Sequence, residues 1–145
     1  LEIFDTAPSI VDAPTARPLS SPVRGDLRLR HLTFAYGTGP VVLHDVDVHV
    51  PAGTTLAIVG ATGSGKSTLV HLLVRLYDPP PGTVFIDGHD VRDVRLADLR
   101  RAVAFVPQET FLFSTSLEEN IAFGSADPPG EARLARVRQA AAIAR

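Results

Sequence analysis

The sequence predicts an α/β fold, and three features of the chain carry this prediction. A short unbroken apolar run, TLAIV at 55–59, leads directly into a glycine-rich loop at 60–65. Leucines at helical spacing follow that loop, and a second unbroken apolar run, AVAFV, occupies 102–106. Continuous apolar runs are typical of buried parallel strands, so the order strand, glycine loop, helix indicates the opening of an α/β unit.

An antiparallel β portion is predicted ahead of this unit. LRLRHLTFAY at 27–36 and VVLHDVDVHV at 41–50 alternate between apolar and polar residues, and glycines and a proline separate them. This pattern predicts two strands, each with one solvent-exposed face. TVFID at 83–87 predicts a further strand, with Gly88 as the turn residue that follows it.

Polar side chains in the second of these strands invite a metal-site interpretation. They are His44, Asp45, Asp47 and His49. Alternating polar residues are what a half-exposed strand ordinarily carries, so we favour a solvated strand face over a metal site.

Helix signals fall at four places. PPPG at 79–82 ends the helix after the glycine loop, and a short helix is expected around 97–101. Ser116 and Glu119 have the spacing of a capping box that opens a helix. The tail at 131–145 predicts a last helix, with Leu134, Val137 and Ala141 on one side.

Composition bounds the class of protein. The chain has 145 residues, of which 45% are hydrophobic and 21% charged, enough for one modest domain. The net charge of -2 gives no bulk attraction to nucleic acid, and the lack of cysteine excludes disulfides and thiolate metal sites. No apolar run approaches the ~18 residues that span a bilayer.

The start of the chain suggests a piece of a longer protein. The sequence contains no methionine and begins at Leu1. Four prolines within residues 1–24 disfavour a long helix, so we expect an extended linker after the short apolar start LEIF at 1–4.

The glycine loop carries the most specific signal. Gly60, Gly65, Lys66 and Ser67 satisfy G-x-x-x-x-G-K-[ST], the P-loop pattern. Glycines let successive backbone N–H groups point into one hollow, and the helix behind it adds its positive end, so the loop suits a triphosphate. The predicted nucleotide-binding residues of the loop are Gly60, Ala61, Thr62, Gly63, Ser64, Gly65, Lys66, Ser67 and Thr68.

Lys66 is the only lysine among 14 cationic residues. A compact ammonium on a flexible stem reaches β and γ phosphates as a point charge, a task that the arginine fork fits less well. We therefore assign Lys66 a catalytic as well as a binding role. The Ser67 hydroxyl is a suitable oxygen ligand for Mg²⁺.

Three stretches that follow one another along the chain narrow the class of nucleotide-binding protein. HLTFAYG at 31–37, the P-loop, and AFVPQETFLFSTSLEENIAFG at 104–124 together resemble the nucleotide-binding domain of ABC transporters. The closest resemblance is to the exporter type, whose membrane domain precedes it on the same chain, and it covers residues 1 to about 125. It implies a P-loop NTPase (RecA-like) core with an N-terminal antiparallel β portion and the start of a helical subdomain, as an incomplete domain.

The resemblance also implies a division of the chain and a set of partners. Residues 1–24 correspond to the linker from a membrane domain, 25–112 to the first part of the ATP-binding core, and 113–145 to the start of the helical subdomain. Residues 109–117 correspond to the surface that meets the transmembrane domain, although Phe111, Leu112 and Phe113 there could equally be ordinary core. A second nucleotide-binding domain, identical or different, would complete the assembly. The resemblance implies no nucleic-acid partner. It places the assembly on the cytoplasmic face of the cell membrane.

Two further site residues come from the resemblance. Tyr36 matches the aromatic residue that stacks on adenine, and a flat ring suits that task. Gln108, within Val106-Pro107-Gln108, matches the glutamine loop, where its amide oxygen would reach Mg²⁺ or the attacking water. The implied cofactors are ATP and Mg²⁺, and the implied catalytic residues are Lys66 and Gln108.

The departures from the family pattern bear on catalysis. The signature stretch, the second acidic motif and the later switch histidine do not occur in these 145 residues. Asp87 ends an apolar strand as the acidic motif does, but Gly88 follows it, and the matching family position is a hairpin. We therefore expect little or no ATP turnover from this piece alone.

The function predicted from the sequence is ATP binding within an ABC-type exporter, coupled to transport by the parent protein. Two alternatives stay open at this point. One is a soluble ABC-type ATPase without a membrane domain, acting in DNA repair or translation. The other is a P-loop small-molecule kinase.

Overall fold

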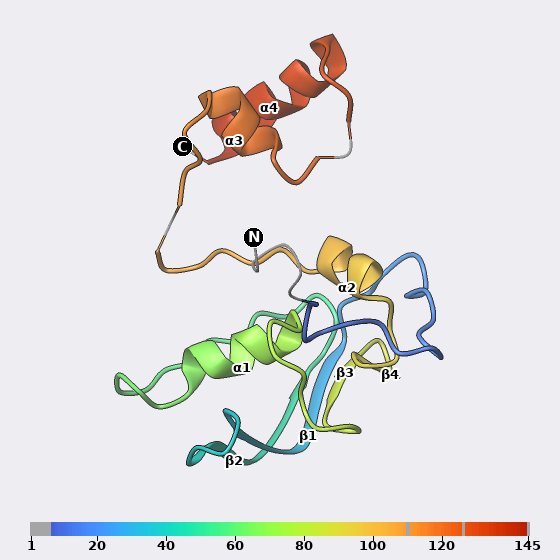
Figure 1. Cartoon of the computed structure of the whole chain (residues 1–145), viewed down its shortest axis with the longest axis vertical. Coiled ribbons are helices and arrows are strands. Elements are labelled where there is room, and N and C mark those ends of the chain that lie inside the picture. Colours follow the sequence, from blue (N-terminus) through green and yellow to red (C-terminus); the bar gives the residue numbers. More distant parts are fainter. Residues whose placement is uncertain (1–6, 110, 126, 145) are drawn as a thin grey trace. The chain divides into compact units, whose positions relative to one another are not determined.

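A computed structural model of the chain describes residues 7–109, 111–125 and 127–144 (Figure 1). The apolar start at 1–4 and Thr110 of the expected partner surface lie outside the described residues. The chain forms two compact units, Leu1–Phe105 and Val106–Arg145. Among the helices of the described ranges, none combines the length and hydropathy needed to cross a bilayer.

The first unit is built on a four-stranded antiparallel sheet with the order β2-β1-β3-β4. Its strands are β1 (Leu27–Ala35), β2 (Val41–Val50), β3 (Val84–Ile86) and β4 (His89–Asp90). These bounds confirm the strands predicted at 27–36, 41–50 and 83–87. The sheet accounts for the predicted antiparallel β portion.

The β1–β2 pair contains an irregularity that the alternating sequence did not reveal. The register shifts between Leu29 and Leu32, both of which are buried. His31 in β1 and Asp45 in β2 both have φ near +45°. As a result of the shift, two consecutive residues are exposed, and the next residue, Leu32, again faces the core.

Asp87 lies in the β3–β4 hairpin, as the family resemblance implied. Asp87 and Gly88 have φ values of 48° and 82°, which suits a tight two-residue turn. The Asp87 carboxylate accepts hydrogen bonds from the backbone N–H groups of Arg24 (2.7 Å) and Asp26 (2.9 Å). Its role is therefore structural.

Two helices complete the first unit. They are α1 (Lys66–Leu73), directly after the glycine loop, and α2 (Leu96–Ala102). Leu72 and Leu99 are fully buried, and with the inner faces of the strands they form one core. Its members are Leu29, Leu32, Leu43, Leu72, Val84, Ile86, Val91, Val94 and Leu99.

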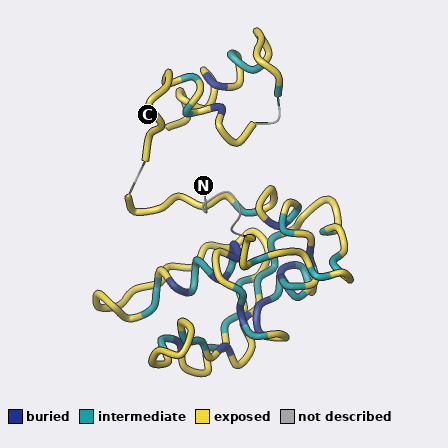
Figure 2. The backbone as a smooth tube through the Cα atoms, viewed as in Figure 1, coloured by how far each residue is buried: buried dark blue, intermediate teal, exposed yellow. Residues whose placement is uncertain are grey.

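The prediction of strands at 55–59 and 102–106 is wrong. Residues 54–61 and 103–107 have no regular structure and are mostly exposed (Figure 2). Val59 and Val106 are 90% and 84% exposed. A parallel strand needs a neighbour for its backbone hydrogen bonds and cover on both faces. The described residues supply neither for these two runs.

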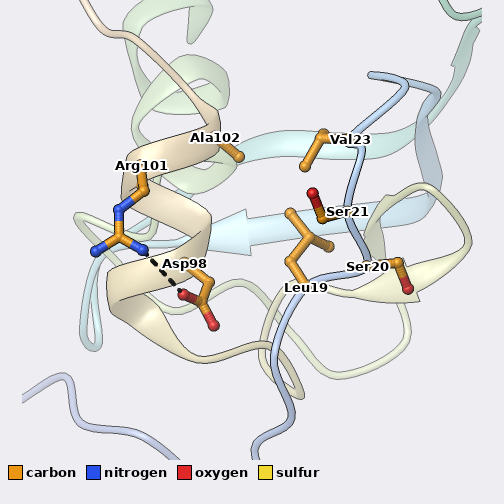
Figure 3. Close-up of a pocket in the computed structure, with 7 residues that line it drawn as sticks. All are labelled: Leu19, Ser20, Ser21, Val23, Asp98, Arg101 and Ala102. Atoms are coloured by element: carbon orange, nitrogen blue, oxygen red, sulfur yellow. Dashed lines mark ion pairs between the residues drawn. The ribbon is translucent and has the colours of Figure 1, made fainter.

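Residues 7–24 contain no helix, as the spaced prolines predicted, and their one β-bridge joins Arg17 to Val94. Past Pro18 this segment follows α2, and a cavity of about 270 Å³ lies between Leu19–Val23 and the helix residues Asp98, Arg101 and Ala102 (Figure 3).

The second unit contains α3 (Leu117–Ala122) and α4 (Glu131–Ile143). Ser116 caps α3 as predicted, because its Oγ accepts a hydrogen bond from the Glu119 N–H at 3.1 Å. The Glu119 carboxylate does not close a capping box. It accepts a 2.6 Å hydrogen bond from Arg133 of α4, which raises the pKa of that guanidinium.

Candidate nucleotide-binding site

The loop between residues 59 and 66 folds tightly ahead of α1. Gly63 and Gly65 have φ values of 82° and 86°, in the left-handed region that favours glycine. A Cβ on Gly65 would lie 2.8 Å from Leu43 Cδ2 and 3.2 Å from the Val42 carbonyl oxygen. Glycine at 65 therefore allows the loop to lie directly against β2.

Lys66 begins α1 and its side chain bends back over the loop. The ammonium donates hydrogen bonds to the carbonyl oxygens of Gly60 (2.8 Å) and Ala61 (2.7 Å) and to Ser64 Oγ (3.3 Å). The one lysine of the chain thus has its charge held at the centre of the loop, solvated by loop oxygens.

A cavity of about 160 Å³ opens beside Lys66. Its lining consists of Val42, Gly63, Ser64, Gly65, Lys66, Ser67 and Thr68. The first N–H groups of a helix have no acceptor within the helix, and the helix dipole favours negative charge there. The lining residues carry an ammonium, hydroxyls and the N–H groups at the start of α1, a set of groups that suits an anion such as phosphate.

Tyr36 contacts α1, the helix that follows this loop. Its hydroxyl donates a 2.9 Å hydrogen bond to Thr68 Oγ1. Its ring makes edge-to-face contacts with Phe34 (centroids 5.0 Å apart) and Tyr77 (4.8 Å). The side chain is 37% exposed, so part of it remains accessible.

Sequence reasoning did not predict the contact between Tyr77 and Tyr36. Tyr77 follows the C-terminal end of α1 and packs against Tyr36, which lies 41 positions earlier in the chain. The available signal was that these are the only two tyrosines in the chain.

The metal residues named from sequence occupy different units. Ser67 is exposed in the first turn of α1 and lines the cavity. Gln108 is exposed in a bend after Pro107, in the second unit. The structure thus joins Ser67 to the phosphate loop, and the place of Gln108 at that loop stays a prediction.

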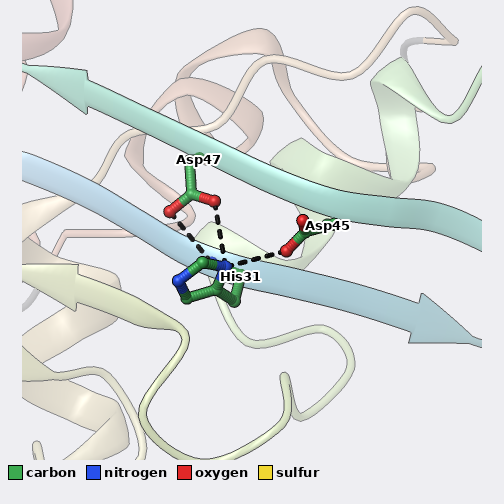
Figure 4. Close-up of side chains that lie close together, drawn as sticks. All are labelled: His31, Asp45 and Asp47. Atoms are coloured by element: carbon green, nitrogen blue, oxygen red, sulfur yellow. Dashed lines mark hydrogen bonds and ion pairs between the residues drawn. The ribbon is translucent and has the colours of Figure 1, made fainter.

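A separate polar cluster lies on the β1–β2 pair (Figure 4). His31 Nδ1 lies 2.8 Å from Asp45 Oδ1 and 3.3 Å from Asp47 Oδ2. The hydrogen bond to Asp45 is the main cause that raises the pKa of His31. These side chains are 82%, 73% and 51% exposed, and the histidine offsets part of the charge of the two carboxylates, so we interpret the cluster as an ion pair bridging the two strands.

The other residues of the sequence-level metal interpretation lie elsewhere. His49 Nε2 is 2.7 Å from Asp26 Oδ2, and this hydrogen bond is the main cause that lowers the pKa of Asp26. His44 is exposed and is not part of the His31 cluster.

The glycine loop with its helix and lone lysine defines a P-loop nucleotide-binding protein. The comparisons with known proteins are more specific. The family described as ABC transporter matches residues 43–145. That match spans more than half of the chain, so the chain belongs to the ABC transporter family.

Curated relatives and a solved structure agree. The chain is 44% identical over 117 residues to an iron-sulfur clusters transporter of Neurospora crassa, covering 81% of this chain and 16% of that protein. It is 48% identical over 118 residues to an ATP-dependent lipid A-core flippase of Ralstonia nicotianae, covering 81% and 20%. A bacterial Atm1-family ABC exporter solved with ATP bound has a TM-score of 0.82 and 37% identity, covering 99% of this chain and 25% of that one.

These matches settle the fold. The chain is part of a P-loop domain of the ABC exporter nucleotide-binding type, and it spans about a quarter or less of the proteins it matches. The kinase alternative is excluded by family membership.

Proposed function

We propose that the chain binds ATP with Mg²⁺ at the P-loop, and that its full-length protein couples ATP hydrolysis to export across a membrane. The observation that carries the proposal is the Lys66 ammonium held over a left-handed glycine loop at the start of α1. Family membership adds the transport context.

The loop residues have distinct tasks in this proposal. Backbone N–H groups between Gly63 and Ser67 would donate to phosphate oxygens, as is usual where a glycine loop leads into a helix, and the Ser64 N–H would first release its 3.2 Å bond to the Ala61 carbonyl oxygen. The ammonium of Lys66 exchanges its contacts with the Gly60 and Ala61 carbonyls for the β and γ phosphates. In this exchange, charged phosphate oxygens replace neutral carbonyl oxygens as acceptors, and charged acceptors form stronger hydrogen bonds.

The residues present also fit Mg²⁺. Ser67 offers an exposed hydroxyl beside the phosphate cavity, and Mg²⁺ prefers oxygen ligands. Gln108 would supply a second oxygen, or orient the attacking water. When bound, Mg²⁺ offsets charge on the phosphates.

Tyr36 would hold the base. Its hydrogen bond to Thr68 fixes the ring relative to α1, so a purine stacked on that ring lies at a set distance from the phosphates. A stacked ring face gives modest selectivity between bases.

Hydrolysis requires more than these residues. A group must orient or deprotonate water, and the γ phosphate needs further charge stabilisation. The second acidic motif and the signature stretch would supply these, and neither occurs in the sequence. We therefore propose that the chain by itself turns over little ATP.

The proposed partners follow from the second unit and the family. Phe111, Leu112 and Phe113 are 76%, 67% and 44% exposed, which suits a surface for the transmembrane domain at 109–117. A second nucleotide-binding domain would complete each site. The assembly would lie on the cytoplasmic face of the membrane.

Phosphate release tests the proposal. Full-length protein in lipid vesicles should hydrolyse ATP, and Lys66→Ala should abolish that activity. The 145-residue chain alone should show little turnover. Brisk, Lys66-dependent hydrolysis by the chain alone would contradict the assignment of water activation and charge stabilisation to the second acidic motif and the signature stretch.

A further inference from the structure

Arg75 is a buried cation at the C-terminal end of α1. Its side chain is 2% exposed. Nε donates to Asp78 Oδ1 at 2.9 Å, Nη1 to the carbonyl oxygens of Val91 (3.3 Å) and Val94 (3.4 Å), and Nη2 to the Val11 carbonyl oxygen at 3.3 Å. One guanidinium therefore joins three separate parts of the chain.

The backbone of Arg75 is fixed as well. Its φ is +49°, and its N–H donates to the Leu72 carbonyl oxygen at 3.2 Å, which closes the helix. Its own carbonyl oxygen accepts a 3.0 Å hydrogen bond from Arg100 of α2. A displacement of α1 therefore displaces the guanidinium and the groups that it holds.

Residues 11–17, here called the tether, are the most distant of those parts in sequence. Asp12 Oδ1 accepts a 2.7 Å hydrogen bond from the N–H of Leu96, the first residue of α2. Arg17 pairs with the β4–α2 connection, donating to the Asp93 carbonyl oxygen (2.8 Å) and accepting from the Arg95 N–H (2.9 Å). After the tether, the chain continues past α2, where Leu19, Ser21 and Val23 face the helix (Figure 3).

We propose that Arg75 is a positioning residue that couples the tether to the nucleotide site through α1. The helix has eight residues, about 12 Å, with the phosphate loop at one end and Arg75 just past the other. Ligand binding orders the start of α1, and tether docking orders its end. Each event therefore favours the other, and the coupling is reciprocal.

This inference rests on the proposed nucleotide site, and one experiment addresses both. Amide exchange is measured on the natural full-length protein, with and without ATP and Mg²⁺, next to the dissociation constant for ATP. Nucleotide should slow exchange in residues 11–17 by about 5-fold or more, the lower end of typical coupling.

Variants at Asp12, the residue after the Val11 carbonyl that Arg75 holds, test the route by loosening the tether without disturbing the core. Asp12→Ala removes the contact with Leu96 and should abolish the nucleotide-dependent protection and weaken ATP binding by the same factor. Asp12→Asn keeps an acceptor oxygen and should restore both. Ser9→Ala, at an exposed position with no side-chain hydrogen bond among the described residues, is the matched control and should change neither.

The two proposals fail in different ways. If ATP binds the natural protein but exchange of the tether does not respond, or if Asp12→Ala binds ATP with unchanged affinity, the coupling is overturned and the nucleotide site stands. If ATP does not bind the natural protein at all, both are overturned.

Discussion

The hydroxyl of Tyr36 donates a 2.9 Å hydrogen bond to Thr68 Oγ1. Tyr36 directly follows β1, and Thr68 is a buried residue in the first turn of α1. This bond ties the proposed base-stacking ring to the helix that carries the phosphate loop. In the proposed site, this bond would hold the base and the phosphates at a fixed separation.

Tyr36→Ala should weaken ATP binding without abolishing it, since stacking of one base on an aromatic ring contributes about 1–3 kcal/mol. Lys66→Ala should cost more, because it removes the only ammonium at the phosphates. Calorimetric titration with ATP and Mg²⁺ measures both losses.

Tyr36→Phe is the matched control for this ranking. It keeps the ring and removes only the hydrogen bond to Thr68, so its loss should be smaller than that of Tyr36→Ala. A larger loss for Tyr36→Ala than for Lys66→Ala would show that the two roles are assigned wrongly.

Gly65→Ala should destabilise the loop more than Gly63→Ala. Both positions have positive φ, where a Cβ costs about 1–2 kcal/mol. Only at Gly65 would the Cβ also meet β2, at 2.8 Å from Leu43 Cδ2, while at Gly63 nothing lies within 4 Å. Thermal unfolding of the two variants gives the comparison, and equal losses would argue against close packing of the loop on β2.

The sequence was most informative where local chemistry decides the structure. The positive φ values of Gly63, Gly65 and Gly88 and the Ser116 cap all follow from the preferences of single residues. These were predicted correctly.

The misses depend on partners distant in the chain. The runs at 55–59 and 102–106 are apolar enough for buried strands, but strand formation requires neighbours that the described residues do not supply. The contacts of Arg75 with Val11 and of Tyr36 with Tyr77 likewise depend on tertiary packing. No periodicity in the sequence encodes such pairs.

The His31 cluster should make the β1–β2 pair sensitive to pH. The hydrogen bond to Asp45 raises the pKa of His31 above its ordinary 6.5, so the folded state favours the charged ring. The stabilisation is therefore fully present below about pH 6.5 and is lost as pH rises through the higher folded-state pKa.

Titration of the His31 ring by NMR checks this prediction. Asp45→Asn should move the pKa of His31 down toward its ordinary value, and His44→Gln, at an exposed position outside the cluster, should not move it. An unchanged pKa in Asp45→Asn would contradict the ion-pair interpretation.

Asn120 should control the shape of the proposed membrane-domain surface. Its Oδ1 accepts from the Phe113 N–H at 2.7 Å, and its Nδ2 donates to the carbonyl oxygens of Phe113 (3.1 Å) and Ser116 (2.9 Å). Asn120→Ala should speed amide exchange at 113–116, because each lost bond contributes about 1 kcal/mol. Asn120→Asp, which keeps the acceptor, should have a smaller effect, and no change in Asn120→Ala would contradict this role.

The central claim is that the loop around Lys66 binds the phosphates of ATP. Calorimetric titration of the natural full-length protein with ATP and Mg²⁺ tests it most directly, with Lys66→Ala beside it. We predict saturable binding by the natural protein, together with a dissociation constant at least about tenfold higher, a loss of about 1.4 kcal/mol, in the variant. Equal binding by both proteins, or no binding by the natural one, would contradict the account.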